Sequence, residues 1–586
     1  MLKSIKTQFN SVFKRFPFSL IMALTGTVAG VLVVQNFDVD AELNERLVSL
    51  LITTILGFFL FIALEFYAER NPKNNILLKL ACFGLLILNY FLLPTDYSQA
   101  GFDFILRSFL YIFAALMAVT FTPFFWKKEI NGFWHLTKAL FIRLFFTAIY
   151  TGVLYLGLIL ALYSADFLLG IAFDEILYAQ LWIVVVGLIG STFFLAGVPK
   201  DFSLLEKEKD YPKGLKAFSQ FILIPLLTLY AFILYSYTAK ILFTGEWPVS
   251  LMTGLILFFC AASLITYFLI YPLTKEEKQP WTSLFSTLVF ILILPMVGML
   301  FWSVSFRLND YGLTVNRYYV ILAGLWILAC ALYFLISQRK NLKVLPISLF
   351  FLAILTSFGP WGALGMSESS QMNRLEAVLV KNNLLVGGKV IKAVDSEVSQ
   401  EDRQQLISAI EYLDSSGSME LLTPWFAGRD NLDADCLNQS YCVVQEGIGL
   451  TYGYYDESGQ GSLLYFYADA PVEPLRVTGY DYVVNDIYYY AADVDVTNFQ
   501  NSTTLVGNLI TIKVPTLSET ETFQFDLSAL KKTLMAESEI LNRPQEEMIL
   551  ETEKGKLILQ GLNLSGEKTE GQNVDSFNGI LLIKKP

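Results

Sequence analysis

The chain has 586 residues, of which 54% are hydrophobic and only 16% are charged, whereas soluble proteins carry roughly 25% charged residues. The net charge of −11 is unevenly divided. The residues from Met366 onward include 33 acidic and 16 basic side chains, and the preceding part includes 20 acidic and 26 basic ones. The acidic balance excludes nucleic acid as a main partner, because phosphates require a basic face. We therefore expect a polytopic α-helical membrane protein with an acidic C-terminal domain.

The first 16 residues, MLKSIKTQFNSVFKRF, carry four basic side chains and lead into an apolar run. This arrangement is similar to a signal peptide, but the small-residue cleavage site is weak and further apolar runs follow. We interpret residues 1–16 as a cytoplasmic tail and the apolar run as an uncleaved first span.

Residues 17–365 form the predicted membrane domain, with about 11 apolar runs that can each cross a hydrocarbon core of ~30 Å as a helix. The predicted spans are 17–35, 47–66, 76–93, 104–126, 139–163, 176–198, 217–241, 249–271, 283–304, 318–337 and 345–364. Lys and Arg gather in the N-terminal tail and in every second connection. The positive-inside rule therefore predicts a cytoplasmic N-terminus and, after eleven crossings, an extracytoplasmic C-terminus.

Residues 217–271 and 283–337 are similar to each other and predict a tandem hairpin repeat. The first helix of each hairpin contains a proline, Pro225 or Pro295, and each second helix ends in YFLI. Chance similarity between apolar helices is the alternative. Proline frees a backbone carbonyl, so both positions are predicted helix breaks. Transporter cores are often built from repeats with interrupted helices.

Residues 366–586 are predicted to form an extracytoplasmic α+β domain, with helices first and mostly antiparallel strands later. Cys436 and Cys442, in DADCLNQSYC, fall on the predicted outer side, where thiols oxidise. We predict a disulfide between them. Two free cysteines and a bridge to another chain are the alternatives.

Few residues in the sequence suggest a catalytic, metal-binding or phosphate-binding site. The chain has one histidine, His135, in a predicted cytoplasmic loop, and its Gly-Gly-Lys lacks the spacing of a phosphate-binding loop. We expect no metal site, no cofactor and no ATPase engine. Any transport would then be gradient-driven, passive or powered by a partner.

The segment RLNDYGLTVNRYY, between predicted spans 9 and 10, places Arg307 and Arg317 on the predicted outer side, against the charge bias. One interpretation is that both arginines anchor span ends and pair with Asp310. The other is an outward-facing site for an anionic lipid headgroup, which includes Arg107, because the planar guanidinium suits bidentate phosphate contact. Within the segment, Gly312 permits a tight turn.

The residue Thr314 follows that glycine at the start of predicted span 10. Threonine is a favoured N-cap residue, because its hydroxyl can accept a hydrogen bond from a backbone N–H of the first helical turn. We therefore expect the Thr314 side chain to cap this helix.

Two stretches, RLNDYGLTVNRYYVILAGLWILACALYFLIS and FGPWGALGMSESSQMNRLEAVLVKNNLLVGGKV, resemble segments of bacterial multi-pass membrane proteins that carry domain of unknown function 4153. The resemblance implies a bacterial inner-membrane protein with an extracytoplasmic tail. It implies no activity and no catalytic residues.

Three functions are consistent with these patterns. The favoured one is a non-ATP-driven permease or a lipid- or envelope-handling module with an outer accessory domain. The alternatives are a membrane enzyme acting on a lipid-linked substrate at the outer face, and an envelope sensor or assembly scaffold. An enzyme is disfavoured, because no acid/base pair stands at a recognisable spacing. The expected partners are the lipid bilayer and, through the C-terminal domain, lipid or envelope proteins.

Overall fold

The protein was analysed as a computed structural model, which divides into two compact units. The first comprises Met1–Gln371 with Ser415–Gly417, and the second comprises Met372–Asp414 with Ser418–Pro586. The residues described by the structure are 10–36, 41–71, 75–95, 97, 102–171, 173–208, 210–245, 251–275, 280–337, 340–393, 398–426, 432, 434–450, 454–455, 462–468, 480–490, 502–515, 520–536, 542–543, 547–565 and 573–584.

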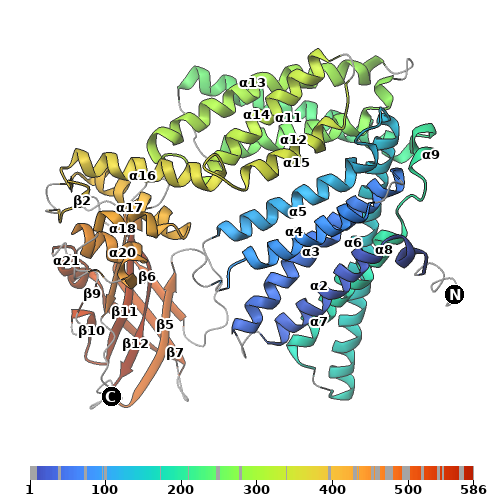
Figure 1. The fold of residues 1–586 in the computed structure, drawn as a ribbon. Coiled ribbons are helices and arrows are strands. Elements are labelled where there is room, and N and C mark those ends of the chain that lie inside the picture. The colour runs from blue at the N-terminus through green and yellow to red at the C-terminus, as the bar shows by residue number, and fades with distance from the viewer. Residues whose placement is uncertain are drawn as a thin grey trace. The chain divides into compact units, whose positions relative to one another are not determined.

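The first unit is helical (Figure 1). Its longer elements are α2 (Pro17–Gln35), α3 (Ala41–Arg70), α4 (Ile76–Leu92), α5 (Asp103–Phe121), α6 (Ile130–Leu169), α7 (Glu175–Val184), α11 (Ile224–Thr244), α12 (Leu251–Ile270), α13 (Pro280–Tyr311), α14 (Val315–Ile336) and α15 (Val344–Thr356). Helix α16 (Ala363–Lys381) begins in this unit and continues into the second. The shorter ones are η1 (Thr122–Phe124), η2 (Val185–Gly190), α8 (Ser191–Ala196), α9 (Phe202–Lys207), α10 (Lys213–Phe218), η3 (Ser219–Leu223) and η4 (Leu273–Lys275).

Within the part of the chain that the structure describes, nine helices are long and apolar enough to cross a membrane. The apolar helices α4 and α15 are shorter, with 17 and 13 residues. The prediction of a polytopic α-helical membrane protein is confirmed, and the count of eleven spans stays a prediction.

The last predicted span, 345–364, is longer than the helix found there. Helix α15 ends at Thr356 and α16 begins at Ala363. Between them Gly359 has a φ of 79°, a left-handed conformation that glycine adopts without steric cost. The following Pro360 disfavours helical dihedrals in that glycine. Glycine and proline therefore end the helix before the apolar run ends.

The two prolines predicted to break helices lie in different settings. Pro225 is in the first turn of α11, directly after the π-helical turn η3, and the chain stays helical throughout. Pro295 lies inside α13, which continues as an α-helix on both sides. A π-turn next to a proline is one way to accommodate the lost backbone hydrogen bond.

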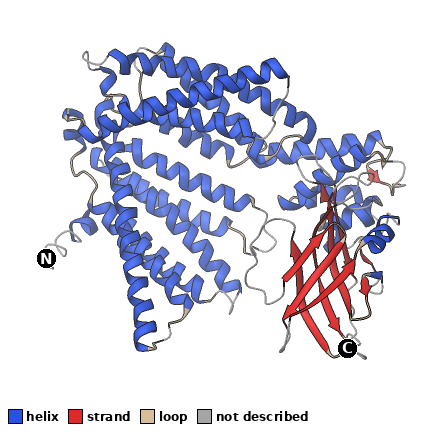
Figure 2. Cartoon of the chain, turned by 180° about the vertical axis from the view of Figure 1, so that it is seen from behind, coloured by secondary structure: helices blue, strands red, loops and turns tan. Residues whose placement is uncertain are grey.

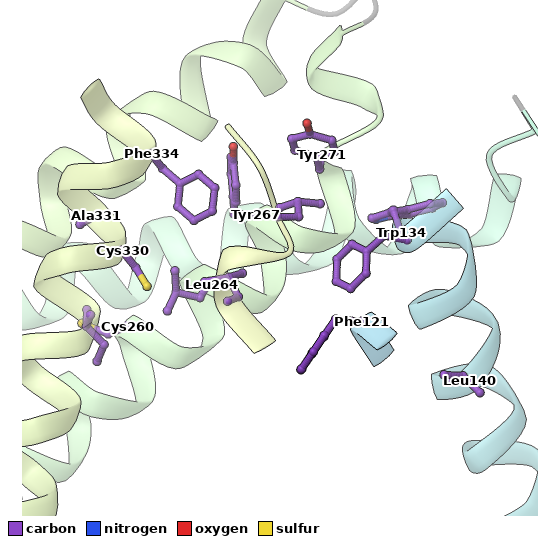
Figure 3. Close-up of a cluster of buried hydrophobic side chains, with 14 of the residues drawn as sticks. Phe121, Trp134, Leu140, Cys260, Leu264, Tyr267, Tyr271, Cys330, Ala331 and Phe334 are labelled. Atoms are coloured by element: carbon purple, nitrogen blue, oxygen red, sulfur yellow. The ribbon is translucent and has the colours of Figure 1, made fainter. Parts of the chain in front are cut away.

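Helices α12, α13 and α14 meet around a cluster of fully buried aromatic rings. The Tyr267 ring centroid lies 4.7 Å from that of Phe290 and 4.8 Å from that of Phe334, and Figure 3 shows Tyr267 and Phe334 next to each other. Cys260 on α12 and Met296 on α13 are also fully buried. These rings and apolar side chains form one part of the contact between the helices, and buried hydroxyl groups such as those of Thr253 and Ser303 form another.

The second unit combines short helices with sheets, and Figure 2 draws its strands in red and its helices in blue. The helical elements are α17 (Gln400–Ser415), η6 (Met419–Leu422), α18 (Thr423–Phe426), α19 (Ala434–Leu437), α20 (Ser440–Cys442), η7 (Val443–Ile448) and α21 (Ser528–Ala536). The strands are β1 (Leu385–Val386), β2 (Lys389–Val390), β3 (Tyr454–Tyr455), β4 (Ser462–Ala468), β5 (Tyr482–Tyr490), β6 (Ser502–Val506), β7 (Leu509–Pro515), β8 (Thr520–Asp526), β9 (Asn542–Arg543), β10 (Ile549–Glu551), β11 (Gly555–Ser565) and β12 (Asn573–Ile583).

Among the described strands, one sheet has the order β3-β4-β11-β12-β5, with β10 paired to β11 and β9 to β4. A second sheet has the order β6-β7-β8, and β1 and β2 form a small hairpin. The pairs are antiparallel, apart from the parallel pair of β4 and β9. Alternating buried side chains such as Leu557 and Leu559 on β11 form the core.

Candidate functional site

One end of the first unit, which we call the polar end, brings together the N-terminal tail and five connections that are far apart in the sequence. These segments are 10–16, 65–71, 122–138, 197–211, 267–275 and 340–343. They are the segments in which the basic residues of the membrane domain gather.

Arg15 connects three of these segments. Its guanidinium forms two hydrogen bonds with the Glu69 carboxylate at the end of α3, at 2.6 and 2.9 Å. It also donates to the backbone carbonyls of Val198, at 3.1 Å, and Pro199, at 2.7 Å. The same guanidinium lies 4.8 Å from the Phe16 ring centroid. The tail, α3 and the loop after α8 are thus held by one side chain.

Arg70 and Lys343 make a second set of connections. Arg70 pairs with Glu129, and its Nε donates to the Pro123 carbonyl at 3.3 Å. Lys343 is only 4% exposed, and its Nζ donates to the carbonyls of Phe124, at 3.0 Å, and Lys127. Burial lowers the pKa of Lys343, and the nearby carboxylates oppose this shift. The segment before α15 is therefore fastened to the segment before α6.

The first turns of α6 supply the remaining connections. Asn131 donates from its Nδ2 to three carbonyls of the 205–208 segment, at 2.7 to 3.4 Å. The fully buried Trp134 donates from Nε1 to the Phe268 carbonyl at the end of α12, at 2.7 Å. His135, expected in a surface loop, is instead 3% exposed within α6, with Nδ1 2.9 Å from Lys138 Nζ.

A pocket of about 300 Å³ opens within the polar end. It is lined by Glu69, Arg70, Lys127, Glu129, Lys200, Asp201, Phe202 and Ser203. The Asp201 carboxylate accepts hydrogen bonds from the Ser203 backbone N–H, at 2.8 Å, and from the Ser203 hydroxyl, at 2.5 Å. These bonds lower the pKa of Asp201, so this carboxyl is ionised at neutral pH. The pocket therefore combines charged groups of both signs.

The α13–α14 turn, residues 311–314, lies at the other end of the membrane unit, because α14 begins at this turn and ends close to Lys343. Gly312 has a φ of 68°, as expected for a tight turn. The Nη1 of Arg317 donates to the carbonyls of Tyr311, at 3.3 Å, and Gly312, at 2.9 Å. Thr314 occupies the N-cap position of α14, but its side chain makes no capping hydrogen bond, so that prediction was wrong.

Two residues of α16 also bind the α13–α14 turn. Gln371 donates from Nε2 to the carbonyls of Tyr311, at 3.0 Å, and Leu313, at 3.1 Å. The Ser370 hydroxyl accepts from the Leu313 backbone N–H at 3.0 Å. The turn is therefore held by Arg317 on one side and by α16 on the other.

The other residues of the predicted anion site are spread over two helices. Arg107 forms an ion pair with Asp103 one turn earlier on α5, at 3.3 Å. Arg307 is half-buried on α13, and Asp310 lies in the same helix with a side chain outside the described residues. A cluster that includes Leu106 and Tyr319 places the first turns of α5 and α14 at the same end of the unit.

The sequence reasoning missed the polar end. A signal was present, because acidic residues such as Glu69, Glu129 and Glu206 alternate with basic residues in the same connections. Charge counting assigns such residues to a side of the membrane, but it does not reveal which of them pair. The partners are known only from the tertiary contacts.

In the second unit, Cys436 and Cys442 are joined by a disulfide, with their Cα atoms 5.2 Å apart. The bridge closes a loop between α19 and α20. Among the described residues, no group of three or more His, Cys, Asp or Glu side chains is placed to hold a metal ion.

The fold defines a polytopic helical membrane protein with a strand-containing C-terminal region. The family "Domain of unknown function (DUF4153)" matches residues 56–385, more than half of the chain, and the chain belongs to this family. An uncharacterized protein of Pasteurella multocida (strain Pm70) is 26% identical over 200 residues, 33% of this chain and 33% of that protein. The matched part thus spans about a third of this relative. No solved structure matches the chain.

Proposed function

We propose that this protein is a lipid- or envelope-handling module of the bacterial inner membrane that is not driven by ATP. In this proposal the N-terminus is cytoplasmic, and the second unit is an outer accessory domain that works together with α13 and α14. The family membership and the apolar helices support a multi-pass membrane protein.

The observation that carries the proposal is the attachment of α16 to the α13–α14 turn. Ser370 and Gln371 make three hydrogen bonds to the backbone of Tyr311 and Leu313. Within α16 the chain passes from the first unit to the second. A displacement of α16 must therefore either carry the turn with it or break these bonds. Ser370 and Gln371 belong to the first unit, and the same helix continues into the second. A continuous helix that is bound to the turn suits a module in which an accessory domain acts on membrane helices.

The packing between α12, α13 and α14 favours lipid or envelope handling over a permease. A permease route needs polar lining groups, and at the level of Tyr267, Phe290 and Phe334 these helices meet through fully buried rings. Work at the membrane surface or through the accessory domain needs no such route.

The proposal is tested by purifying the full chain in a mild detergent and identifying the bound lipids and envelope proteins by mass spectrometry. We expect enrichment of particular lipids or envelope proteins over those retained by an unrelated multi-pass protein. The double variant Ser370→Ala/Gln371→Ala should lose this enrichment. The matched control Ser369→Ala/Asn373→Ala removes similar polar groups from exposed positions of α16 and should keep it.

Two results would contradict the proposal. The first is a lipid and protein composition equal to that of the unrelated protein. The second is gradient-dependent uptake of a soluble solute by proteoliposomes containing the parent chain, which would make the protein a permease.

A further inference from the structure

We propose that the pocket at the polar end binds a phosphate-bearing anion through the ammonium groups of Lys127 and Lys200. This site lies at the end of α14 opposite to the α13–α14 turn, and a 22-residue helix separates the two ends by about 33 Å. It is therefore independent of the attachment on which the proposed function rests.

The three carboxylates of the pocket already have partners. Glu69 is held by two hydrogen bonds from Arg15, and Glu129 is paired with Arg70. Asp201 accepts from the backbone and the hydroxyl of Ser203. The charges of Glu69 and Glu129 are therefore balanced by Arg15 and Arg70. Among the pocket-lining carboxylates, the ionised Asp201 remains to offset the two lysines, which together outweigh it.

Unlike Glu69 and Glu129, the two lysines of the pocket have no ion-pair partner among the described residues. Lys127 precedes α6 and Lys200 follows α8, and both side chains are exposed and line the pocket. In the described part of the chain, no carboxylate lies within ion-pair distance of either ammonium group. Two positive charges from separate segments thus face one pocket, which favours an anion between them.

Arg70 adds directional donors to this positive charge. Of its five N–H donors, one is used by the Pro123 carbonyl and another by Glu129. The ring of Phe124 lies 5.3 Å from the guanidinium, which fixes its plane. A phosphate held by the two lysines can accept from the remaining N–H groups. Arginine and lysine together are a common phosphate-binding set.

The size and position of the pocket narrow the ligand class. A volume of about 300 Å³ is at the small end of ligand pockets and suits a phosphate with a glycerol-sized substituent. Phe202, only 2% exposed, lies behind this lining and packs against the Phe66 ring. Because the pocket lies at helix ends, a lipid phosphate monoester and a soluble phosphate monoester can both present this chemistry.

The test uses the full chain purified in detergent. Native mass spectrometry measures binding of dioleoylphosphatidic acid, with dioleoylglycerol as the phosphate-free control, and thermal-shift titration measures binding of glycerol 3-phosphate. The variant Lys127→Gln/Lys200→Gln should weaken binding by at least about tenfold. The variant Lys127→Arg/Lys200→Arg should retain it. The matched control Lys128→Gln/Lys207→Gln makes the same charge change outside the pocket lining and should leave binding within about twofold.

Each outcome decides the proposal. Lysine-dependent binding of phosphatidic acid alone supports a lipid headgroup ligand, and lysine-dependent binding of glycerol 3-phosphate supports a soluble phosphate monoester. Binding of neither probe to the parent overturns the proposal. Equal losses in the pocket variant and the control variant also overturn it, because they show attraction by general surface charge. Size-exclusion profiles confirm that all variants are folded.

Discussion

The two ends of the membrane unit are held together in different ways. At the polar end, Arg15 reaches Pro199, 184 residues away, and Lys343 reaches Phe124, 219 residues away. At the α13–α14 turn, Arg317 binds the Gly312 carbonyl only five residues earlier, and one further element, α16, approaches. The polar end thus joins six segments of the unit, whereas the described hydrogen bonds of the turn come from α14 and, about 60 residues later, from α16. The two ends therefore differ in how many segments each one connects.

Reporter fusions test which end faces the cytoplasm, with an all-or-none result. Fusions after Lys207 and Lys340, at the polar end, should report the cytoplasm, because basic residues are retained on that side. Fusions after Gly245 and Gly417 should report the outside. Cytoplasmic activity of the Gly417 fusion would contradict the count of eleven spans, and inverted results throughout would exchange the two ends.

The substitution Lys343→Met should produce the largest loss of stability. It leaves the carbonyls of Phe124 and Lys127 without their buried donor, at a cost of about 3 kcal/mol in the free energy of unfolding. Thermal unfolding in detergent measures the effect. Lys128→Met, an exposed neighbour, is the control and should change stability by less than about 0.5 kcal/mol. Equal effects of the two substitutions would mean that the polar end is not held by specific contacts.

Removal of the disulfide should affect the second unit alone. Cys436→Ser/Cys442→Ser opens a short loop and should lower the stability of this unit by about 2 kcal/mol. Hydrogen exchange should show faster opening around α19 and α20 and unchanged protection at the polar end. In the parent, a thiol reagent should label both cysteines only after reduction, and ready labelling without reductant would exclude the bridge.

A pH titration examines the second unit through Asp402, which is 4% exposed. Burial raises the pKa of its carboxyl, but hydrogen bonds from Lys381, Asn382 and Ser399 outweigh burial and lower it. A lowered pKa in the folded state gives stability that is present above the unfolded pKa of about 3.9 and is lost as pH falls through the folded value.

The matching substitution is Asp402→Asn. It should cost about 1.5 kcal/mol at pH 7 and progressively less below pH 4. Chemical denaturation of the parent and the variant at pH 7 and pH 3 measures the difference. A cost that does not change with pH would show that the charge of Asp402 contributes nothing.

The smallest expected effect is at the turn. Gln371→Ala removes two hydrogen bonds to backbone carbonyls that Arg317 and solvent can partly replace, and should cost about 1 kcal/mol. Hydrogen exchange should show faster opening near the Leu313 amide and little change at the Trp134 indole. If both ends loosen together, they are not mechanically distinct.

Hydropathy located the membrane helices well but underestimated the length of some of them. Helix α3 runs from Ala41 to Arg70, whereas residues 47–66 were predicted, and α6 runs from Ile130 to Leu169, whereas residues 139–163 were predicted. Hydropathy detects only the apolar part of a helix, whereas the helix itself continues into polar turns at each end. His135 was assigned to a loop for this reason, although it lies in the first turns of α6.

The contacts of the candidate site could not be predicted, because they depend on tertiary structure. Gly312 was correctly expected in a tight turn, since a local conformation is encoded locally. The pairing of Arg70 with Glu129 joins two connections separated by helices, and many alternative pairs have the same sequence pattern. The role of Gln371 was also missed, because an uncharged side chain produces no charge signal.

The reach of Lys343 has a consequence for biosynthesis. Its partners, the carbonyls of Phe124 and Lys127, emerge about 219 residues earlier, and at roughly 5–20 residues per second the ribosome needs between about 10 and 45 s to cover this distance. During this interval the two carbonyls must accept hydrogen bonds from water or from another donor. The arrival of this one ammonium group then joins the segment before α15 to the segment before α6. A nascent chain that stalls before Lys343 lacks this connection.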